Sequence, residues 1–264
     1  MPPELPTTTV DIDPARRFGG MARLYGEAAI PRLAAARVCV VGIGGVGSWV
    51  VETLARSGVG ALVLIDLDNI AESNINRQIH ASDETLGQAK VAAMAARIRS
   101  INPTCRVETV EDFLTPENVA DLLHDVDLVV DAIDNVRAKV ALAAHCRQQR
   151  LALIMAGGAG GKRDPQQIRV GDLAHTINDP LLSKVRARLR REHGFPREPK
   201  KKFAIETVYS IEPPRLPAAA CDAAPGQGMQ GLSCAGYGSS MAMTASVGLF
   251  IAARALERLL VGAT

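Results

Sequence analysis

The chain alternates between short, densely apolar runs and longer segments in which apolar and polar residues mix. Five runs stand out before residue 160: RVCVVG from residue 37, ALVLID from 61, CRVETV from 105, VDLVVDAID from 126 and LALIMAG from 151. Most of them lack the strict alternation of a strand with one face in water, which is typical of strands buried on both faces in a parallel sheet. We therefore expect five buried, parallel strands.

The segments between these runs have helical spacing. Within residues 86–101, apolar side chains recur at intervals of three and four, at Val91, Met94, Ile98 and Ile101, before Pro103 ends the pattern. Alternating strands and helices predict an α/β, Rossmann-like fold, which is a largely parallel sheet flanked by helices with right-handed crossovers. In such sheets, ligands bind at the carboxyl ends of the strands.

The pattern changes after Gly157. AGGAGGKRDP predicts a loop, and residues 180–193 predict a basic helix. Residues 194–238 are a Pro- and Gly-rich insertion that we expect to be mobile. A C-terminal helix is expected from Ser239 to about Leu260. With 264 residues, 47% of them hydrophobic, the chain can bury one sizeable core, whereas two full domains would be cramped. We expect residues 1–264 to form a single domain.

Composition narrows the cellular context. Five cysteines without a C-x-x-C pair argue against a disulfide framework and a structural zinc site, so we expect a reducing cytoplasm. The N-terminus lacks the apolar core of a signal peptide. Residues 232–253 carry no charge and approach the length of a membrane span, but eight of them are Gly, Ser or Thr. We therefore expect a buried helix there and no membrane association.

A glycine turn, GIGGVG at residues 42–47, joins the first predicted strand to a predicted helix. Such a turn presents backbone N–H groups and a helix N-terminus to a phosphate, and glycines remove side chains that would block close approach. Asp66 closes the second strand 19 residues after Gly47, where a carboxylate can accept hydrogen bonds from ribose hydroxyls. These features predict an adenine-nucleotide site, and the alternative is a tight turn without a ligand.

The residues after Asp66 favour a triphosphate over a nicotinamide cofactor. DLDNIAESNINRQ brings Asn74, Arg77 and Gln78 to the same strand end, and Lys90 follows on the next helix. Two fixed cations suit a triphosphate, and Asp134, just past the fourth strand in DAIDN, suits Mg²⁺ among phosphates. Together they could stabilise charge on an α-phosphate attacked by a carboxylate. Taken singly, each residue could instead form a surface ion pair.

These motifs resemble those of the ubiquitin-activating-enzyme-like superfamily, whose bacterial members adenylate carboxylates. RFGGMARLYG, NRQIHA, GGAGG and DPLLSKVRARLR further resemble its tRNA threonylcarbamoyladenosine dehydratase branch. The absence of two C-x-x-C pairs separates the chain from zinc-holding, sulfur-carrier-adenylating relatives. The resemblance implies ATP and Mg²⁺ as ligands and a homodimer, in which Arg17 or Arg23 could replace an arginine that relatives contribute across the dimer.

The resemblance and the residue pattern give two sets of candidate residues. The expected nucleotide-binding residues are Gly42, Gly44, Gly45, Gly47, Asp66, Asp68, Asn74, Arg77, Gln78, Lys90 and Asn135. The expected catalytic residues are Arg77, Lys90, Asp134 and Cys234, with Asp134 also holding the metal.

Charge distribution favours an RNA substrate. Residues 184–202 carry nine Lys or Arg against two Glu, although the net charge of the whole chain is only +2. Such clustering is typical of a surface that contacts a phosphate backbone, while a solvated helix face is the alternative. We expect backbone and shape contacts around an anticodon loop, because few aromatic residues interleave the cations.

The resemblance implies that the reaction is the ATP-dependent cyclisation of threonylcarbamoyladenosine in tRNA. Adenylation of the threonyl carboxylate would be followed by attack of a carbamoyl nitrogen on the activated carbonyl within the same molecule. One alternative is an adenylating enzyme for the C-terminus of a small sulfur-carrier protein. Another is a nicotinamide-dependent oxidoreductase or a nucleotide-sensing module.

Two further residues are ambiguous. Cys234, in a glycine-rich approach to the last helix, is either an exposed thiol that takes a persulfide or acyl group or a small buried residue. The family's link to cysteine-desulfurase systems makes a sulfur-acceptor protein an expected partner. His80 follows the NRQI motif and is either structural or functional, whereas Cys39 and Cys146 are expected in the core.

Overall fold

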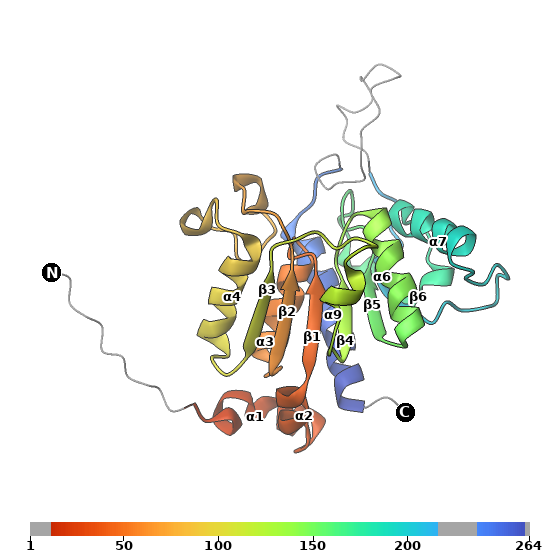
Figure 1. The fold of residues 1–264 in the computed structure, drawn as a ribbon. Coiled ribbons are helices and arrows are strands. Elements are labelled where there is room, and N and C mark those ends of the chain that lie inside the picture. The colour runs from red at the N-terminus through yellow and green to blue at the C-terminus, as the bar shows by residue number, and fades with distance from the viewer. Residues whose placement is uncertain (1–11, 216–236, 262–264) are drawn as a thin grey trace.

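The computed structural model describes residues 12–215 and 237–261. Its centre is a seven-stranded sheet in the order β3-β2-β1-β4-β5-β7-β6 (Figure 1). The strands are β1 (Arg37–Val41), β2 (Ala61–Ile65), β3 (Arg106–Val110), β4 (Leu128–Asp131), β5 (Ala152–Ala156), β6 (Ile168–Asp172) and β7 (Glu206–Ser210). All neighbours pair in parallel except β6 and β7, which are antiparallel. The predicted Rossmann-like fold is therefore confirmed.

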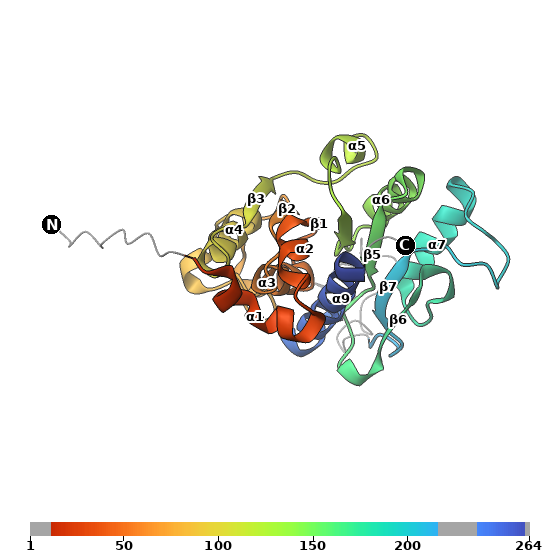
Figure 2. The same cartoon turned by 90° about the horizontal axis from the view of Figure 1, so that it is seen from below.

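Helices cover both faces of the sheet (Figures 1 and 2). They are α1 (Pro14–Tyr25), α2 (Ala29–Ala35), α3 (Gly47–Arg56), α4 (Lys90–Ile101), α5 (Val119–Leu122), α6 (Val136–Gln149), α7 (Pro180–Glu192) and α9 (Met241–Val261). Alternate residues of β1 point to opposite sides, because Val40 joins a core cluster with α3, α4 and α9, while Cys39 joins one with α6 and α7. Two apolar layers thus hold the sheet.

The elements predicted before residue 160 lie where the apolar pattern places them. All five expected strands are present, but the expectation that all are buried is wrong for β3, which lies at the edge of the sheet and is largely exposed. The helix expected over residues 86–101 begins at Lys90, because residues 87–90 form backbone hydrogen bonds with the segment after β2 instead of a helical turn, as when the Lys90 N–H donates to the Asp68 carbonyl at 3.0 Å. The basic helix and the C-terminal helix are also confirmed, as α7 and α9.

The prediction of a mobile insertion over residues 194–238 is wrong for its first half. Within it, β7 is an inner strand of the sheet, between β5 and β6. Phe195 and Phe203 are buried in the core on the α6–α7 side. The strand was missed because ETVYS is short and half polar, and β6, which reads IRVGD, lies at a partly exposed edge. Residues 216–236 lie outside the described part.

None of the helices in the described segments is long and apolar enough to span a bilayer.

Candidate active site

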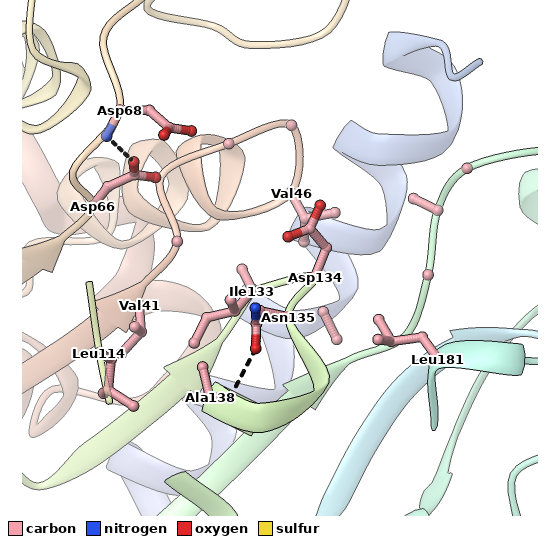
Figure 3. Close-up of a pocket in the computed structure, with 18 of the residues that line it drawn as sticks. Val41, Val46, Asp66, Asp68, Leu114, Ile133, Asp134, Asn135, Ala138 and Leu181 are labelled. Carbon is pink, nitrogen blue, oxygen red and sulfur yellow. Dashed lines mark hydrogen bonds between the residues drawn. The ribbon is translucent and has the colours of Figure 1, made fainter. Parts of the chain in front are cut away.

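A cavity of about 740 Å³ opens at the carboxyl ends of β1, β2, β4 and β5, where the fold predicts a ligand site (Figure 3). One end is lined by the glycine turn, the end of β2 and the first turn of α4. The other end is lined by the glycine-rich loop after β5 and the start of α7. Residues from at least six segments therefore meet around one space that is large enough for more than one ligand group.

The four glycines of the turn divide into two pairs. A Cβ on Gly47 would lie 1.8 Å from the Gly42 carbonyl oxygen, and one on Gly42, where φ is +88°, would lie 2.9 Å from the backbone of Ala132. These two glycines are thus required by the fold. Gly44 and Gly45 line the cavity, and a Cβ on Gly44 would meet nothing closer than the Gln78 amide at 3.9 Å. The second pair leaves room for a ligand.

Asp66 is held in place by backbone donors. The Ile43 N–H donates to its Oδ2 at 2.6 Å and the Asp68 N–H to its Oδ1 at 2.9 Å, the latter drawn in Figure 3. Burial raises the pKa of the Asp66 carboxyl, and the nearby Lys90 ammonium opposes that rise. The side chain therefore ties the glycine turn to the end of β2, with carboxylate lone pairs left for ribose hydroxyls.

Lys90 provides a buried cation at the same strand end. Its Nζ lies 2.7 Å from Oδ2 of Asp68 and 3.9 Å from Oδ1 of Asp66. The lysine side chain is 7% exposed, whereas that of Asp68 is 58% exposed. Because the stem emerges at the first residue of α4, the ammonium lies at the cavity wall and can contact an incoming phosphate.

Arg77 extends over the glycine turn. Its side-chain carbons come within 3.3 Å of the position of a Cβ on Gly45. The guanidinium donates through Nη1 to the Ser73 carbonyl at 2.7 Å and to Oδ1 of Asn76 at 3.0 Å, and Nε1 of Trp49 donates to the Arg77 carbonyl at 3.0 Å. The backbone is thereby fixed to α3, and the half-buried cation lines the cavity.

The two neighbouring amides differ in what they do. Oδ1 of Asn74 accepts from the Ala71 N–H at 3.0 Å, so this buried side chain closes its own turn. Gln78 is 4% exposed and lines the cavity, yet its Oε1 has no hydrogen-bond partner among the described residues. An unpartnered buried acceptor at a cavity wall is costly unless a ligand or water satisfies it, which fits the predicted binding role.

Asp134 and Asn135 follow β4. Asn135 caps α6, because its Oδ1 accepts from the Ala138 N–H at 3.1 Å, whereas exposed Asp134 lines the cavity (Figure 3). No group of three His, Cys, Asp or Glu side chains in residues 12–215 and 237–261 could hold a metal. A Mg²⁺ ion here would therefore need phosphate oxygens and water beside Asp134, which is its usual coordination.

A buried ion pair that was not predicted from the sequence lies at the other end of the cavity. Nζ of Lys162 lies 3.7 Å from Oδ2 of Asp179 and donates to the Ser210 carbonyl at 2.9 Å. Asp179 also accepts from the Gly158 N–H at 2.9 Å and caps α7. Burial lowers the pKa of Lys162. The lysine directly after GGAGG and the Asp-Pro before the basic helix were the available signals.

A second buried pair lies beneath the loop that carries Asp134. Nζ of Lys139 donates to Oδ1 of Asp131 at 2.9 Å and to the Ala156 carbonyl at 2.9 Å, and both side chains are fully buried. Asp131 also accepts from the Ile133 N–H at 3.1 Å. The pair therefore fixes the loop between β4 and α6.

Four of the remaining candidates, Arg17, Cys39, His80 and Cys146, do not line the cavity. Cys39 and Cys146 are buried as predicted, and burial raises the pKa of both thiols. Burial, with Lys90 and Arg97, lowers the pKa of His80 to about 4. The Arg17 guanidinium donates to the Ile101 carbonyl at 2.9 Å and so contacts the end of α4. Cys234 lies outside the described residues.

The chain is similar to known proteins over nearly its full length. It is 47% identical to tRNA threonylcarbamoyladenosine dehydratases of Haemophilus influenzae and Escherichia coli K12, covering 93% of this chain and 94% of each relative. A crystal structure of the E. coli enzyme in complex with ATP has a TM-score of 0.83 and 46% identity, over 94% of this chain and 95% of that one. The sequence profile of the ThiF family matches residues 19–262, and the chain therefore belongs to the ThiF family.

Proposed function

We propose that this protein catalyses the ATP-dependent dehydration of threonylcarbamoyladenosine in tRNA, closing a ring on the modified base beside the anticodon. The observation that carries the proposal is the convergence of Arg77, Lys90 and Asp134 on one cavity above the glycine turn. Full-length relatives at 47% identity are named for this activity, and a neighbouring structure with 46% identity binds ATP.

In the proposed complex, the triphosphate of ATP follows the glycine turn. Gly44 and Gly45 allow close approach of the phosphates, and Asp66 accepts from a ribose hydroxyl. Oε1 of Gln78 gains the donor it lacks from a hydroxyl or amino group of the adenosine, or from a water. Arg77 and Lys90 contact phosphate oxygens. Mg²⁺ held by Asp134 would add positive charge on the phosphates.

The first half-reaction joins the threonyl carboxylate to the α-phosphate. A carboxylate oxygen attacks phosphorus, the bond to the bridging oxygen breaks and pyrophosphate leaves, while Arg77 and Lys90 stabilise the negative charge that grows on the phosphoryl oxygens. Both cations are held by carboxylate, backbone or amide partners before the reaction, so little reorganisation is needed.

The second half-reaction closes the ring. A carbamoyl nitrogen attacks the activated carbonyl carbon, the C–N bond forms, the C–O bond to AMP breaks and the N–H proton leaves to solvent. The end of the cavity formed by Gly158, Lys162 and Leu181 is where we place the nucleoside. Both reacting groups then lie in one pocket, which makes the step effectively unimolecular.

The position of the basic helix supports an RNA partner. Asp179 caps α7, and Pro180 and Leu181 at its start line the cavity. A phosphate backbone that follows the side of α7 with exposed Lys184 and Arg191 and half-buried Arg188 would therefore lead toward the cavity. We place the tRNA contacts in residues 184–202.

Three further expectations remain part of the proposal. We propose a homodimer, for which α9 offers exposed apolar side chains. A sulfur-acceptor protein that contacts Cys234 stays a prediction, as does Cys234's catalytic role. The buried free thiols Cys39, Cys105 and Cys146 are compatible with the predicted cytoplasmic location.

Mass spectrometry of nucleosides from modified tRNA incubated with the protein and ATP tests the proposal. Loss of one water, a decrease of about 18 mass units, is expected. Lys90→Gln should reduce tRNA-dependent pyrophosphate exchange by roughly 10²- to 10³-fold, because a charge on the phosphates is lost. Arg99→Gln, an exposed position of the same helix, is the matched control and should retain activity.

Unchanged nucleoside with intact ATP would contradict the proposal. Pyrophosphate exchange that depended on a small carrier protein and not on tRNA would favour the sulfur-carrier alternative.

A further inference from the structure

A short basic loop follows α7, and contacts with neighbouring side chains fix it in place. Residues 196–202, which we call the basic arm, contain four cations and one carboxylate, and Arg197 through Lys202 are all exposed. The arm projects from the side of the molecule near α7 (Figure 1). Like charges this close together on one exposed loop repel one another, which an anionic ligand would offset.

The arm is fixed at both ends by aromatic side chains. Phe195 and Phe203 flank it, their ring centroids lie 4.9 Å apart, and both are buried. The guanidinium carbon of Arg147 lies 4.2 Å from the Phe195 centroid, and that of Arg190 lies 5.2 Å from the Phe203 centroid. Each ring thus has a cation over its face, which adds to the stabilisation from burial.

Hydrogen bonds fix the backbone of the arm as well. Nε of Arg190 donates to the Pro196 carbonyl at 3.1 Å, and the Phe203 N–H donates to Oδ1 of Asp172 at 2.8 Å. In the middle, Nε2 of His175 lies 2.9 Å from the Pro199 carbonyl oxygen. The cations are consequently displayed on a constrained loop, which lowers the conformational entropy lost when a ligand binds.

The charges of the arm, like those of the helix, are compensated only in part, since Lys184, Arg186 and Arg190 of α7 also form no ion pair among the described residues. On α7, Arg188 and Arg191 share Glu192, and Arg186 donates to Thr176. On the arm, Lys201 pairs with Glu198 at 3.1 Å. Within the described part of the chain, Arg197, Lys200 and Lys202 form no ion pair, and Lys201–Glu198 is the arm's pair. Three uncompensated cations on one fixed loop favour a polyanionic partner.

The distance from the cavity identifies the part of the RNA. α7 begins at the cavity wall and its 13 residues span roughly 20 Å before the chain enters the arm. At about 3.4 Å of axis per phosphate of one strand, the spacing of a B-form duplex, an RNA backbone that runs along α7 would cover roughly six nucleotides over this length. A loop at the far end of α7 would then contact a stem, beyond the nucleotide that enters the cavity.

Resting on the proposed function, we propose that the basic arm binds the phosphate backbone of the anticodon stem and sets the affinity for tRNA, without contributing to the chemical steps. Because phosphate contacts carry no sequence information, the arm would recognise a duplex by its charge and shape.

The test compares two triple variants. One carries Arg197→Gln, Lys200→Gln and Lys202→Gln in the arm, and the control carries Arg16→Gln, Arg99→Gln and Arg106→Gln on α1, α4 and β3, near the opposite edge of the sheet. Binding of threonylcarbamoyladenosine-modified tRNA is measured over a series of salt concentrations. The KM values for tRNA and ATP, kcat and the thermal unfolding midpoint are measured beside it.

We expect the arm variant to bind tRNA roughly tenfold more weakly or worse, and its slope of log affinity against log salt to fall by about two to three, since each lost phosphate contact removes about 0.9. The KM for tRNA should rise, while kcat, the KM for ATP and the unfolding midpoint stay unchanged. The control should match the wild type in all of these.

The possible failures are distinguishable. Suppose that the wild type forms the cyclic nucleoside. If the arm variant then binds tRNA with unchanged affinity and salt slope, or if the control loses as much tRNA affinity as the arm variant, the inference about the arm is overturned and the proposed function stands. If the arm variant alone loses affinity but the wild type yields no cyclic nucleoside, RNA binding by the arm is upheld and the dehydratase function fails.

Discussion

His80 is a buried imidazole that the proposed reaction does not use. It is 5% exposed, neither ring nitrogen has a hydrogen-bond partner in the described structure, and Lys90 and Arg97 add positive charge nearby. These surroundings favour the neutral ring, because a proton would add a third charge in a poorly hydrated site. His80 does not line the cavity, and its structural or functional role stays a prediction.

His80 makes stability dependent on pH. Its pKa is about 4 in the folded chain against about 6.5 when unfolded, so the unfolded state binds protons first as the pH falls. The contribution of His80 to the free energy of unfolding is fully present above about pH 6.5. It decreases by about 3 kcal/mol as the pH falls to 4. We expect His80→Phe to have the same free energy of unfolding as the wild type at pH 7, or a higher one. Its free energy of unfolding should also decrease less between pH 6.5 and 4, the acid limb of the stability curve. Urea unfolding at several pH values measures both.

The control is His193→Phe, which replaces an exposed histidine. It should keep the acid limb of the wild type. An acid limb that survived in His80→Phe would contradict the assignment of the proton to His80.

At the scale of elements, the apolar pattern predicted the strands whose positions are determined by their own residues. The strands β1, β2, β4 and β5 are buried on both faces and read as apolar runs, so their positions followed from the pattern, and with them the edge where the site lies. β6 and β7 depend on each other across the chain, and the Lys162–Asp179 pair joins residues 17 apart. No local signal encodes such partnerships, although Asp-Pro did mark the start of α7.

The strand-to-helix turn allows its two roles to be separated by mutation. Gly47→Ala would place a methyl group 1.8 Å from the Gly42 carbonyl oxygen, so we expect loss of folding or a large fall in the unfolding midpoint. Gly44→Ala meets nothing closer than 3.9 Å, so the fold should persist while ATP affinity falls by roughly tenfold or more, because the methyl group lies at the cavity wall.

Circular dichroism melts and calorimetric ATP titrations distinguish these outcomes. Equal ATP affinity in Gly44→Ala and the wild type would show that the phosphates do not approach this glycine.

At the scale of the whole molecule, α9 connects the site to the outer surface. Thr244, in its first turn, lines the cavity, and Met243, Val247 and Ile251 pack into the core. The carboxylate of Glu206 on β7 pairs with Arg254 and Arg258, which holds the helix against the second half of the sheet. The side of α9 that faces away from the core thus has a fixed orientation relative to the active site.

That outer side is unusually apolar for a surface exposed to water. Met241, Leu249 and Phe250 are about half exposed, and Ala245 completes a stripe at intervals of four with Met241 and Leu249. Neighbouring apolar side chains of this size on one face are typical of a surface that binds a partner. Because the resemblance implies a homodimer, a second copy of the chain is the partner we expect.

The prediction is that the wild type sediments with the mass of two chains and that Leu249→Glu with Phe250→Glu shifts it to the mass of one. Charges placed at an apolar interface lose hydration without gaining partners, which opposes association. Val170→Glu, at a comparably exposed position on β6, is the control and should remain dimeric. A monomeric wild type, or a double variant with unchanged mass and unfolding midpoint, would show that this side of α9 does not join two chains.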